Sequence, residues 1–288
     1  MILIMVLGFF LITSGIVVEE YTTTSNTYAI ATKVYLKEQA YYQAKEAFKS
    51  FVSYFKVYFK NEASYDSLDE FLPFPIKVPL KNGWISISVI DEDRFLNLNI
   101  VKSQVGAQII KRLFKELKVN SLHVSTLRTW ITGKGFWDKS FPIKKSEIED
   151  KRELLFLGMS EEDFYGKVGV EGAIPGISEF VTVWGDGKVN INTAPKEVLL
   201  ALFPSYAREI VDEVISYRTK HPFKKVDDLL FVNGMNFQIL HALRPWIKVK
   251  SNYFKVIIEV KVGDVEGSLT VVLKRVGPHY KVVYWRYS

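Results

Sequence analysis

The first eighteen positions are almost all apolar and carry no charge. An α-helix rises about 1.5 Å per residue, so this run would measure roughly 27 Å, close to the hydrocarbon thickness of a bilayer. A cleaved secretory signal is the alternative, and it would show a basic start and a small-residue cleavage site. No basic residue precedes the run and nothing like Ala-x-Ala follows it. The pattern therefore predicts a transmembrane or fibre-core helix over residues 1–18.

Helical periodicity continues after Glu19 and Glu20, because no proline or glycine occurs before Lys60. Large or apolar side chains recur every three or four residues, which places them on one face of a helix. The sequence predicts an amphipathic stalk helix over residues 19–61. Its stripe either packs on the chain's own domain or contacts neighbouring subunits. We interpret it as a subunit interface made of Tyr41, Ala44, Phe48, Phe51, Phe55 and Tyr58.

Alternation of apolar and polar residues begins after a proline-rich segment, Asn61–Gly83, that is typical of a connecting loop. Trp84–Ile90 alternates and is rich in β-branched residues, so it predicts a strand. Arg94–Ile100 also alternates, and Asp91–Asp93 between them has the composition of a turn. These three segments predict a β-hairpin.

The pattern is helical from about residue 102 to residue 250, with amphipathic segments at Val105–Leu117 and Ser125–Ile131. Strand patterns return at Tyr253–Val262, Val265–Arg275 and Tyr280–Tyr287. The predicted fold class is α+β: a pilin-like long N-terminal helix and an antiparallel sheet, with a large α-helical domain inserted between strands. The head would comprise residues 62–101 and 251–288, and the insertion residues 102–250.

A short internal repeat lies within the predicted insertion. Glu153–Met159 reads Glu-Leu-Leu-Phe-Leu-Gly-Met, and Asp228–Met235 reads Asp-Leu-Leu-Phe-Val-Asn-Gly-Met. Each predicts a short helix, a turn at glycine and a second helix, because glycine adopts backbone conformations that other residues avoid.

Composition narrows the class of protein. Hydrophobic residues make up 48% of the 288 residues and aromatic residues 14%, which excludes a disordered chain. The net charge of +6 is modest for this length and does not by itself indicate nucleic acid. The chain has no cysteine, so disulfides and thiolate metal sites are excluded.

Four motifs together carry a family resemblance. Lys37–Ala47 has a Glu-Gln-Ala run before aromatic residues, Ile90–Asn99 contains Arg-Phe-Leu-Asn-Leu-Asn, Leu127–Ile131 reads Leu-Arg-Thr-Trp-Ile, and Gly185–Ala194 ends in Asn-Ile-Asn-Thr-Ala. In this order, behind an apolar helix, they resemble the minor pseudopilin K (GspK) family of type II secretion. The resemblance gives structural roles to Arg94, Phe95, Asn97, Asn99, Asn190, Asn192, Thr193 and Ala194.

The resemblance implies a protein that is not an enzyme. Members of the family sit with other minor pseudopilins, of the I and J types, at the tip of a periplasmic pseudopilus that helps to export folded proteins. A member would be processed by prepilin peptidase and would cross the inner membrane once, with its bulk in the periplasm. Its tip position implies that it initiates or caps fibre assembly.

Three departures from the family pattern affect these expectations. No basic leader ending in glycine precedes the apolar run, so we expect the leader to be encoded upstream of Met1. The run has no acidic residue before Glu19, which fits the K type. The family often follows Trp-Ile with Asp-x-Asp and binds calcium nearby, but Thr132, Gly133 and Lys134 follow Trp130-Ile131 here. Calcium needs six to eight oxygen ligands, several of them anionic, and these three residues supply no carboxylate. We therefore predict no metal and no cofactor.

A DNA-binding helix-hairpin-helix module of the ComEA kind is the alternative resemblance, over residues 189–247. Its phosphate contacts would come from Gly234, Lys224, Lys225 and Lys248. The first of its two hairpins would fall at Phe203–Tyr206, which has no glycine. We therefore expect no nucleic acid partner.

Catalytic residues are not indicated by the sequence. The four histidines, His123, His221, His241 and His279, do not have the spacing of a helical metal pair. We interpret Asn190 and Asn192 as braces for a helix that begins near Pro195, with Thr193 as its N-cap.

Overall fold

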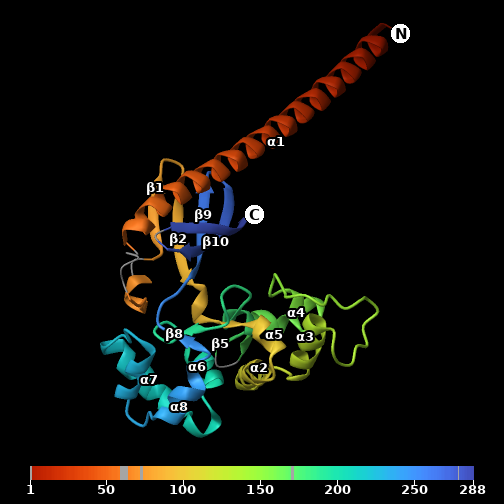
Figure 1. The fold of residues 1–288 in the computed structure, drawn as a ribbon. Helices are drawn as coiled ribbons and strands as arrows, with labels where there is room; N and C mark the ends of the chain where they lie inside the picture. The colour runs from red at the N-terminus through yellow and green to blue at the C-terminus, as the bar shows by residue number, and fades with distance from the viewer. Residues whose placement is uncertain (1, 59–63, 72–73, 170–171, 278) are drawn as a thin grey trace.

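The computed structural model describes residues 2–58, 64–71, 74–169, 172–277 and 279–288, with the backbone alone for Leu3 and residues 56–58. The chain begins with one continuous helix of 57 residues, α1 (Ile2–Tyr58), about 85 Å long (Figure 1). The predicted continuity of the front helix with the stalk is confirmed. The front part of α1 is long and apolar enough to cross a membrane and is not covered by the rest of the described chain.

Five strands form one antiparallel sheet in the order β1-β2-β9-β10-β11. The predicted strands at the carboxyl end are confirmed, and they join the early strand in a single layer. Two neighbours in this layer, β2 and β9, are separated in sequence by the whole helical part of the chain. The strands are β1 (Ile76–Leu80), β2 (Gly83–Asp91), β9 (Tyr253–Val262), β10 (Val265–Val276) and β11 (His279–Tyr287).

The predicted hairpin between residues 84–90 and 94–100 is wrong. The hairpin partner of β2 is β1, which comes from the segment predicted as a loop. After β2 the chain makes a 3₁₀ turn, η2 (Glu92–Arg94), and leaves the sheet. The alternation of residues 94–100 is real, but it reflects Leu96 and Leu98, which are fully buried in a different core.

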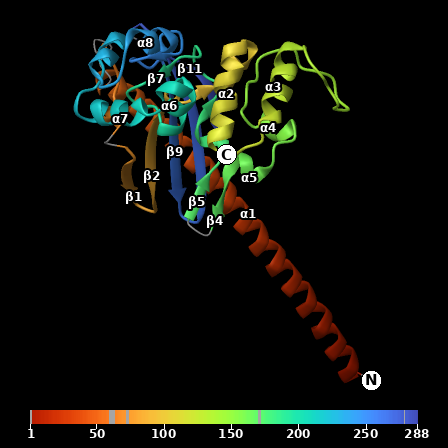
Figure 2. The same ribbon diagram turned by 90° about the horizontal axis from the view of Figure 1, so that it is seen from below.

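The rear part of α1 covers one face of the sheet (Figure 2). Ala44, Phe48, Phe51 and Phe55 are buried there, and the ring of Phe55 meets that of Phe254 edge-on at 5.4 Å. Packing on the chain's own sheet is thus what the structure shows for this stripe. These four side chains are not available to a neighbouring subunit in this conformation.

A second hydrophobic core lies in the helical part of the chain and contains buried residues between Leu96 and Val249. It sits beyond the sheet, at the end of the molecule far from the amino terminus (Figure 1). Its helices are α2 (Gln104–Glu116), α3 (Leu122–Thr132), α4 (Glu153–Phe156), α5 (Glu161–Tyr165), α6 (Lys196–Leu202), α7 (Ile210–Lys220) and α8 (Phe237–Leu243), with 3₁₀ turns η3 (Leu98–Lys102), η4 (Ile177–Glu179), η5 (Ser205–Ala207) and η6 (Val226–Phe231). A further 3₁₀ turn, η1 (Leu68–Phe71), lies between α1 and β1, and its Phe71 packs against the core of the sheet. Its short strands are β3 (Leu96–Asn97), β4 (Gly166–Gly169), β5 (Gly172–Pro175), β6 (Val181–Thr182), β7 (Val189–Asn190) and β8 (Ile247–Lys248).

Two consecutive units of this helical part share one arrangement; we call residues 96–182 the first unit and residues 189–248 the second unit. Each unit is closed by a short parallel pair of strands, β3 with β6 and β7 with β8. An asparagine ends the first strand of each pair and folds back on the chain. The side-chain oxygen of Asn97 accepts the N–H of Asn99 at 2.8 Å, and that of Asn190 accepts the N–H of Asn192 at 3.0 Å.

The second asparagine of each unit clasps a distant backbone segment. Asn99 donates to the carbonyl of Ile148 at 3.1 Å and accepts its N–H at 2.9 Å. Asn192 does the same with Phe223, at 2.9 Å in both directions. A primary amide has a donor and an acceptor side by side, so it satisfies both polar groups of one buried residue. The two clasps hold equivalent loops.

The resemblance between the units continues after the clasps. In each unit, a carboxylate five positions after the clasped residue accepts the N–H of the residue that directly follows the clasped one. Glu153 accepts the N–H of Glu149, and Asp228 accepts that of Lys224, each at 2.9 Å. A turn at Gly158 (φ +99°) or at the corresponding glycine (φ +82°) then leads into α5 or α8. The repeat predicted at 153–159 and 228–235 is confirmed, although the leading helix of the second copy is the 3₁₀ turn η6.

Candidate functional site

A buried polar network joins the sheet to the helical part of the chain where β2 ends and β9 begins. Its members come from five separate segments of the sequence. Nearly all are less than a tenth exposed, so each charge or dipole needs a partner inside the protein. We call this set the junction network; it contains Asp66, Asp91, Asp93, Asn190, Thr193, Lys248, Ser251 and Arg275.

Asp91, the last residue of β2, is the central acceptor. One of its oxygens, Oδ2, accepts the hydroxyls of Thr193 and Ser251, both at 2.6 Å, and the amide of Asn190 at 3.4 Å. The other, Oδ1, accepts the N–H of Asp93 at 2.9 Å. This carboxylate therefore ties the sheet to the second unit and to the segment that returns into β9.

Asp93 makes a second connection to the returning chain. Its Oδ2 accepts the N–H of Asn252 at 2.5 Å and pairs with Nζ of Lys248 at 2.7 Å. Gly185 lies against the other oxygen. A Cβ on Gly185 would come within 2.7 Å of that oxygen, and its φ of +103° is strained for any other residue. The glycine of the Gly185–Ala194 motif is thus required by the buried carboxylate.

Asp66 anchors the segment between α1 and the sheet. Its carboxylate receives Nη1 and Nη2 of Arg275 at 2.8 and 2.9 Å and the N–H of Ser251 at 2.6 Å. The guanidinium of Arg275 also lies 4.9 Å from the ring centre of Phe254. This ion pair is enclosed, so the charges are stabilised by each other and not by water.

The electrostatics of the network follow from its burial. Removal from water raises the pKa of Asp91 to about 7, and the nearby charge of Asp93 adds to the increase. Burial also raises the pKa of Asp93, although Lys248 opposes that shift. Burial lowers the pKa of Arg275, but the hydrogen bonds and charge of Asp66 outweigh it, so the net shift is upward.

The four asparagines named from the family resemblance form the turns and clasps described above. The side chain of Asn97 also donates to the carbonyl of Trp184 at 3.0 Å. The prediction that Thr193 is the N-cap of α6 is wrong. Its hydroxyl bonds to Asp91, and the N-cap position belongs to Pro195, which forms no side-chain cap.

The remaining motif residues pack beside the network. The carbonyl of Ala194 accepts Nη2 of the buried Arg218 at 2.7 Å. Burial lowers the pKa of Arg218 to about 10, and the nearby charge of Arg94 contributes. The guanidinium of Arg94 lies 5.5 Å over the ring of Phe95.

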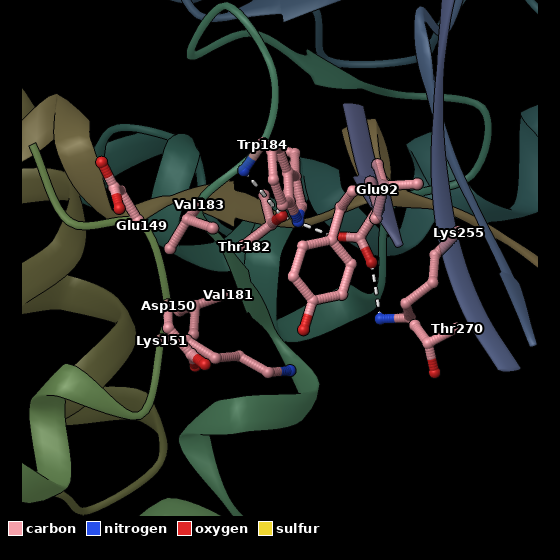
Figure 3. A pocket seen from close by; sticks show the side chains of 12 residues that line it. Glu92, Glu149, Asp150, Lys151, Val181, Thr182, Val183, Trp184, Lys255 and Thr270 are labelled. Atoms are coloured by element: carbon pink, nitrogen blue, oxygen red, sulfur yellow. Dashed lines mark hydrogen bonds and ion pairs between the residues drawn. The ribbon is translucent and has the colours of Figure 1, made fainter. Parts of the chain in front are cut away.

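A small cavity of about 120 Å³ lies between the sheet and the first unit (Figure 3). Glu92 is its central polar group: it accepts the hydroxyl of Thr182 and pairs with Nζ of Lys255 at 2.5 Å. Val181, Val183 and Trp184 are among its apolar lining residues. The carboxylate of Glu92 is therefore already paired within the protein. The cavity is part of the contact between the sheet and the first unit.

Sequence reasoning missed Asp66, Ser251 and Arg275. Asp66 and Ser251 lie in connecting segments without a repeating pattern. Arg275 did carry a signal: it follows Leu269, Val271 and Leu273 at every second position of β10, which is the buried face. A charged residue on that face requires a buried partner.

The residues of the DNA-binding alternative do not form one surface. Lys248 is enclosed by Asp93 and Asp186, at 2.7 and 3.0 Å, and is not free to contact a phosphate. Lys224 and Lys225 are exposed, but both of their backbone N–H groups bond to Asp228. Gly234 has the positive φ of a hairpin glycine.

The side chain of Tyr58, the last residue of the predicted stalk stripe, lies outside the described residues. Tyr41 contacts Tyr287 edge-on at 5.1 Å, beside the sheet core. The four histidines remain dispersed, and no group of three or more His, Asp or Glu side chains that would suit a metal ion occurs in the described ranges. Near Trp130, the carboxylate of Glu153 is engaged by the indole N–H and by Lys144, at 2.8 and 2.9 Å.

Comparison with known proteins agrees with this architecture. Residues 189–249, which cover the second unit, match the family described as type II secretion system (T2SS), protein K. The fold is similar to a chain in the crystal structure of the GspK–GspI–GspJ complex of the type 2 secretion system of enterotoxigenic Escherichia coli. The TM-score is 0.64 at 19% identity, over 88% of this chain and 98% of that one. Comparison with curated protein sequences gave no match. The family resemblance and the pilin-like α+β fold class are confirmed.

Proposed function

We propose that the chain works as a minor pseudopilin at the tip of a type II secretion pseudopilus, because residues 189–249 match the family of the type II secretion system protein K. The observation that carries this proposal is the shape of the molecule. One continuous helix has an uncovered apolar front, and its rear is built into a globular head. Such a helix can sit in the membrane before assembly and among other helices afterwards.

The exposed face of α1 offers a contact surface for those helices. Tyr21, Tyr28, Tyr35 and Tyr42 occur at intervals of seven residues and are all at least 60% exposed. A spacing of seven keeps side chains on one side of a helix and is the spacing of helix pairs that coil around each other. We propose this tyrosine stripe, in place of the buried stripe, as the face that contacts the neighbouring minor pseudopilins.

The position of the helical part supports a role at the fibre tip. It lies at the end of the head farthest from the amino terminus (Figure 1). A further subunit stacked on that end would meet this bulk and would find no free helix to continue the fibre. We propose that the chain initiates or caps the pseudopilus in this way. Chains distributed evenly along isolated fibres would contradict capping.

The expected partners are minor pseudopilins of the I and J types, and the similar solved chain comes from a complex that contains GspI and GspJ. We also propose processing by prepilin peptidase and a single inner-membrane crossing with the bulk of the chain in the periplasm. Comparison of the protein's mass in strains with and without the peptidase tests the first point, since processing should shorten the chain.

Co-purification tests the interface. The chain would be expressed in full with its I- and J-type partners, and Tyr28→Ser/Tyr35→Ser should reduce recovery of the complex at least about tenfold. Ile30→Ser is the matched control, because Ile30 is also exposed but lies on the opposite side of α1. Equal losses in both variants would reject the stripe. Undiminished secretion in a strain that lacks the chain would reject the proposed function.

DNA binding is the competing function, and no observation favours it over assembly. Lys248 is enclosed by two carboxylates, and the backbone N–H groups of Lys224 and Lys225 are already bonded to Asp228. Tight binding of duplex DNA that weakens steeply with salt would support it against the proposal.

A further inference from the structure

An open groove of about 410 Å³ lies on the second unit, between the carboxyl end of α7 and η6. The segment that leads from α1 to the sheet closes one side of it through Tyr65. Helix α7, which borders it, lies in the part of the molecule far from the amino terminus (Figure 1), and no residue of α1 lines the groove. The groove therefore belongs to neither the junction network nor the proposed subunit interface.

Aromatic side chains form the walls of the groove. Tyr65, Tyr217 and Phe231 line it, and the ring of Tyr217 is fixed by stacking on Phe223 at 5.3 Å. Phe231, the last residue of the 3₁₀ turn η6, is 69% exposed. Several aromatic side chains gathered along one groove are typical of a surface that binds another molecule.

The rim of the groove is basic. Lys220 and Lys224 line it, and Lys225 is adjacent. Residues 218–225 contain no acidic residue. Within the described part of the chain, none of these three lysines takes part in an ion pair. Their charge is therefore available to an acidic ligand.

The polar groups of the groove favour a polypeptide over a nucleic acid. Phosphate groups are held best by free backbone N–H groups together with cations. Here the N–H groups of Lys224 and Lys225 are already bonded to Asp228, at 2.9 and 3.1 Å. The carboxylate of Asp228 also lies within the groove, where these two N–H groups occupy one of its oxygens.

We propose that this groove binds an extended acidic segment of a partner protein, with glutamates or aspartates at the lysines and an aromatic or aliphatic side chain between Tyr65, Tyr217 and Phe231. Charge complementarity identifies the occupant: the rim offers cations, and the walls offer stacking surfaces. The inference does not depend on the proposed assembly function, because it uses no residue of α1.

Fluorescence anisotropy on the full chain in detergent micelles tests the proposal. The probe is a labelled twelve-residue peptide with the repeat Glu-Glu-Phe, and it should bind with an affinity that falls as salt is added. Lys220→Glu/Lys224→Glu should weaken binding by about tenfold or more. Phe231→Ser should weaken it several-fold without changing the salt dependence.

The matched control is Lys115→Glu/Lys134→Glu, which makes the same change in charge at two exposed lysines outside the groove. It should bind the probe nearly as well as the wild type. The proposal is overturned if both double variants lose equal affinity or if a Lys-Lys-Phe peptide binds equally well. Tighter binding of oligothymidylate than of the acidic peptide would also overturn it and would favour single-stranded nucleic acid. Unchanged circular dichroism in each variant shows that the fold is retained.

Discussion

The guanidinium of Arg275 and the carboxylate of Asp66 form a two-point ion pair, at 2.8 and 2.9 Å, that is almost fully enclosed. The pair fastens β10 to the segment that leaves α1, although the two residues lie far apart in sequence. Arg275→Met should cost about 3–5 kcal/mol, because Asp66 would be left as an unpaired buried charge. Urea denaturation of the purified chain measures this.

The double variant Asp66→Leu/Arg275→Met separates the charge from the shape of the site. Replacing both partners by apolar residues should recover most of the lost stability. A double variant as unstable as Arg275→Met alone would show that the pair contributes through its hydrogen bonds to Ser251 and not by neutralising charge.

Asp91 makes the stability of the fold depend on pH. An unfolded aspartate loses its proton near pH 3.8, but the folded carboxyl keeps its proton up to about pH 7. The stabilisation is therefore complete below about pH 4 and is lost as the pH rises towards 7. Asp91→Asn should remove this part of the pH dependence, because the hydroxyls of Thr193 and Ser251 can accept as well as donate.

Thermal unfolding of both proteins across this pH range is the measurement. Glu70 has its pKa raised to about 7 as well, by burial and by the charge of Asp66, so some slope should remain in the variant. Identical slopes in the wild type and Asp91→Asn would contradict the assignment.

The two asparagine clasps should act locally. Asn192→Ala leaves two backbone groups of Phe223 without partners, which should cost about 1–3 kcal/mol. Asn99→Ala should do the same at Ile148. Hydrogen exchange read by mass spectrometry should show faster exchange around residue 223 in the first variant and around residue 148 in the second. Equal loosening of both units in each variant would refute the independence of the clasps.

The buried and exposed faces of α1 should respond differently to truncation. Phe55→Ala creates a cavity against Phe254 and should cost about 3–5 kcal/mol. Tyr28→Ser removes an uncovered side chain and should change the stability of the isolated chain by less than about 0.5 kcal/mol. Chemical denaturation of the two variants compares them directly. A large loss in Tyr28→Ser would mean that this face packs within the chain.

Calcium should not stabilise the chain. The carboxylate of Glu153, the acidic group nearest to Trp130, is already satisfied by Lys144 and by the indole N–H. Addition of millimolar calcium should therefore leave the melting temperature unchanged within about 1 °C, and chelators should have no effect. An upward shift that saturates with calcium would reveal a site elsewhere.

Local periodicity was sufficient to predict the long helix and the carboxyl-terminal strands, because each buries one face along its own length. It failed at Arg94–Ile100, where Leu96 and Leu98 alternate in the manner of a strand but enter the core of the helical part. It also failed at Asp91 and Asp93, which have the composition of a surface turn. Their partners come from Asp66, Ser251 and other distant residues, and no local pattern records such contacts.

The pairing of β2 with β9 has a consequence for biosynthesis. On the ribosome, β2 emerges before residues 92–252, and its central neighbour follows only after all of them have been translated. At common elongation rates this delay is on the order of ten seconds or more. One edge of β2 must therefore keep its backbone N–H and C=O groups without their final partners during that interval, so the central pairing of the sheet forms late in folding.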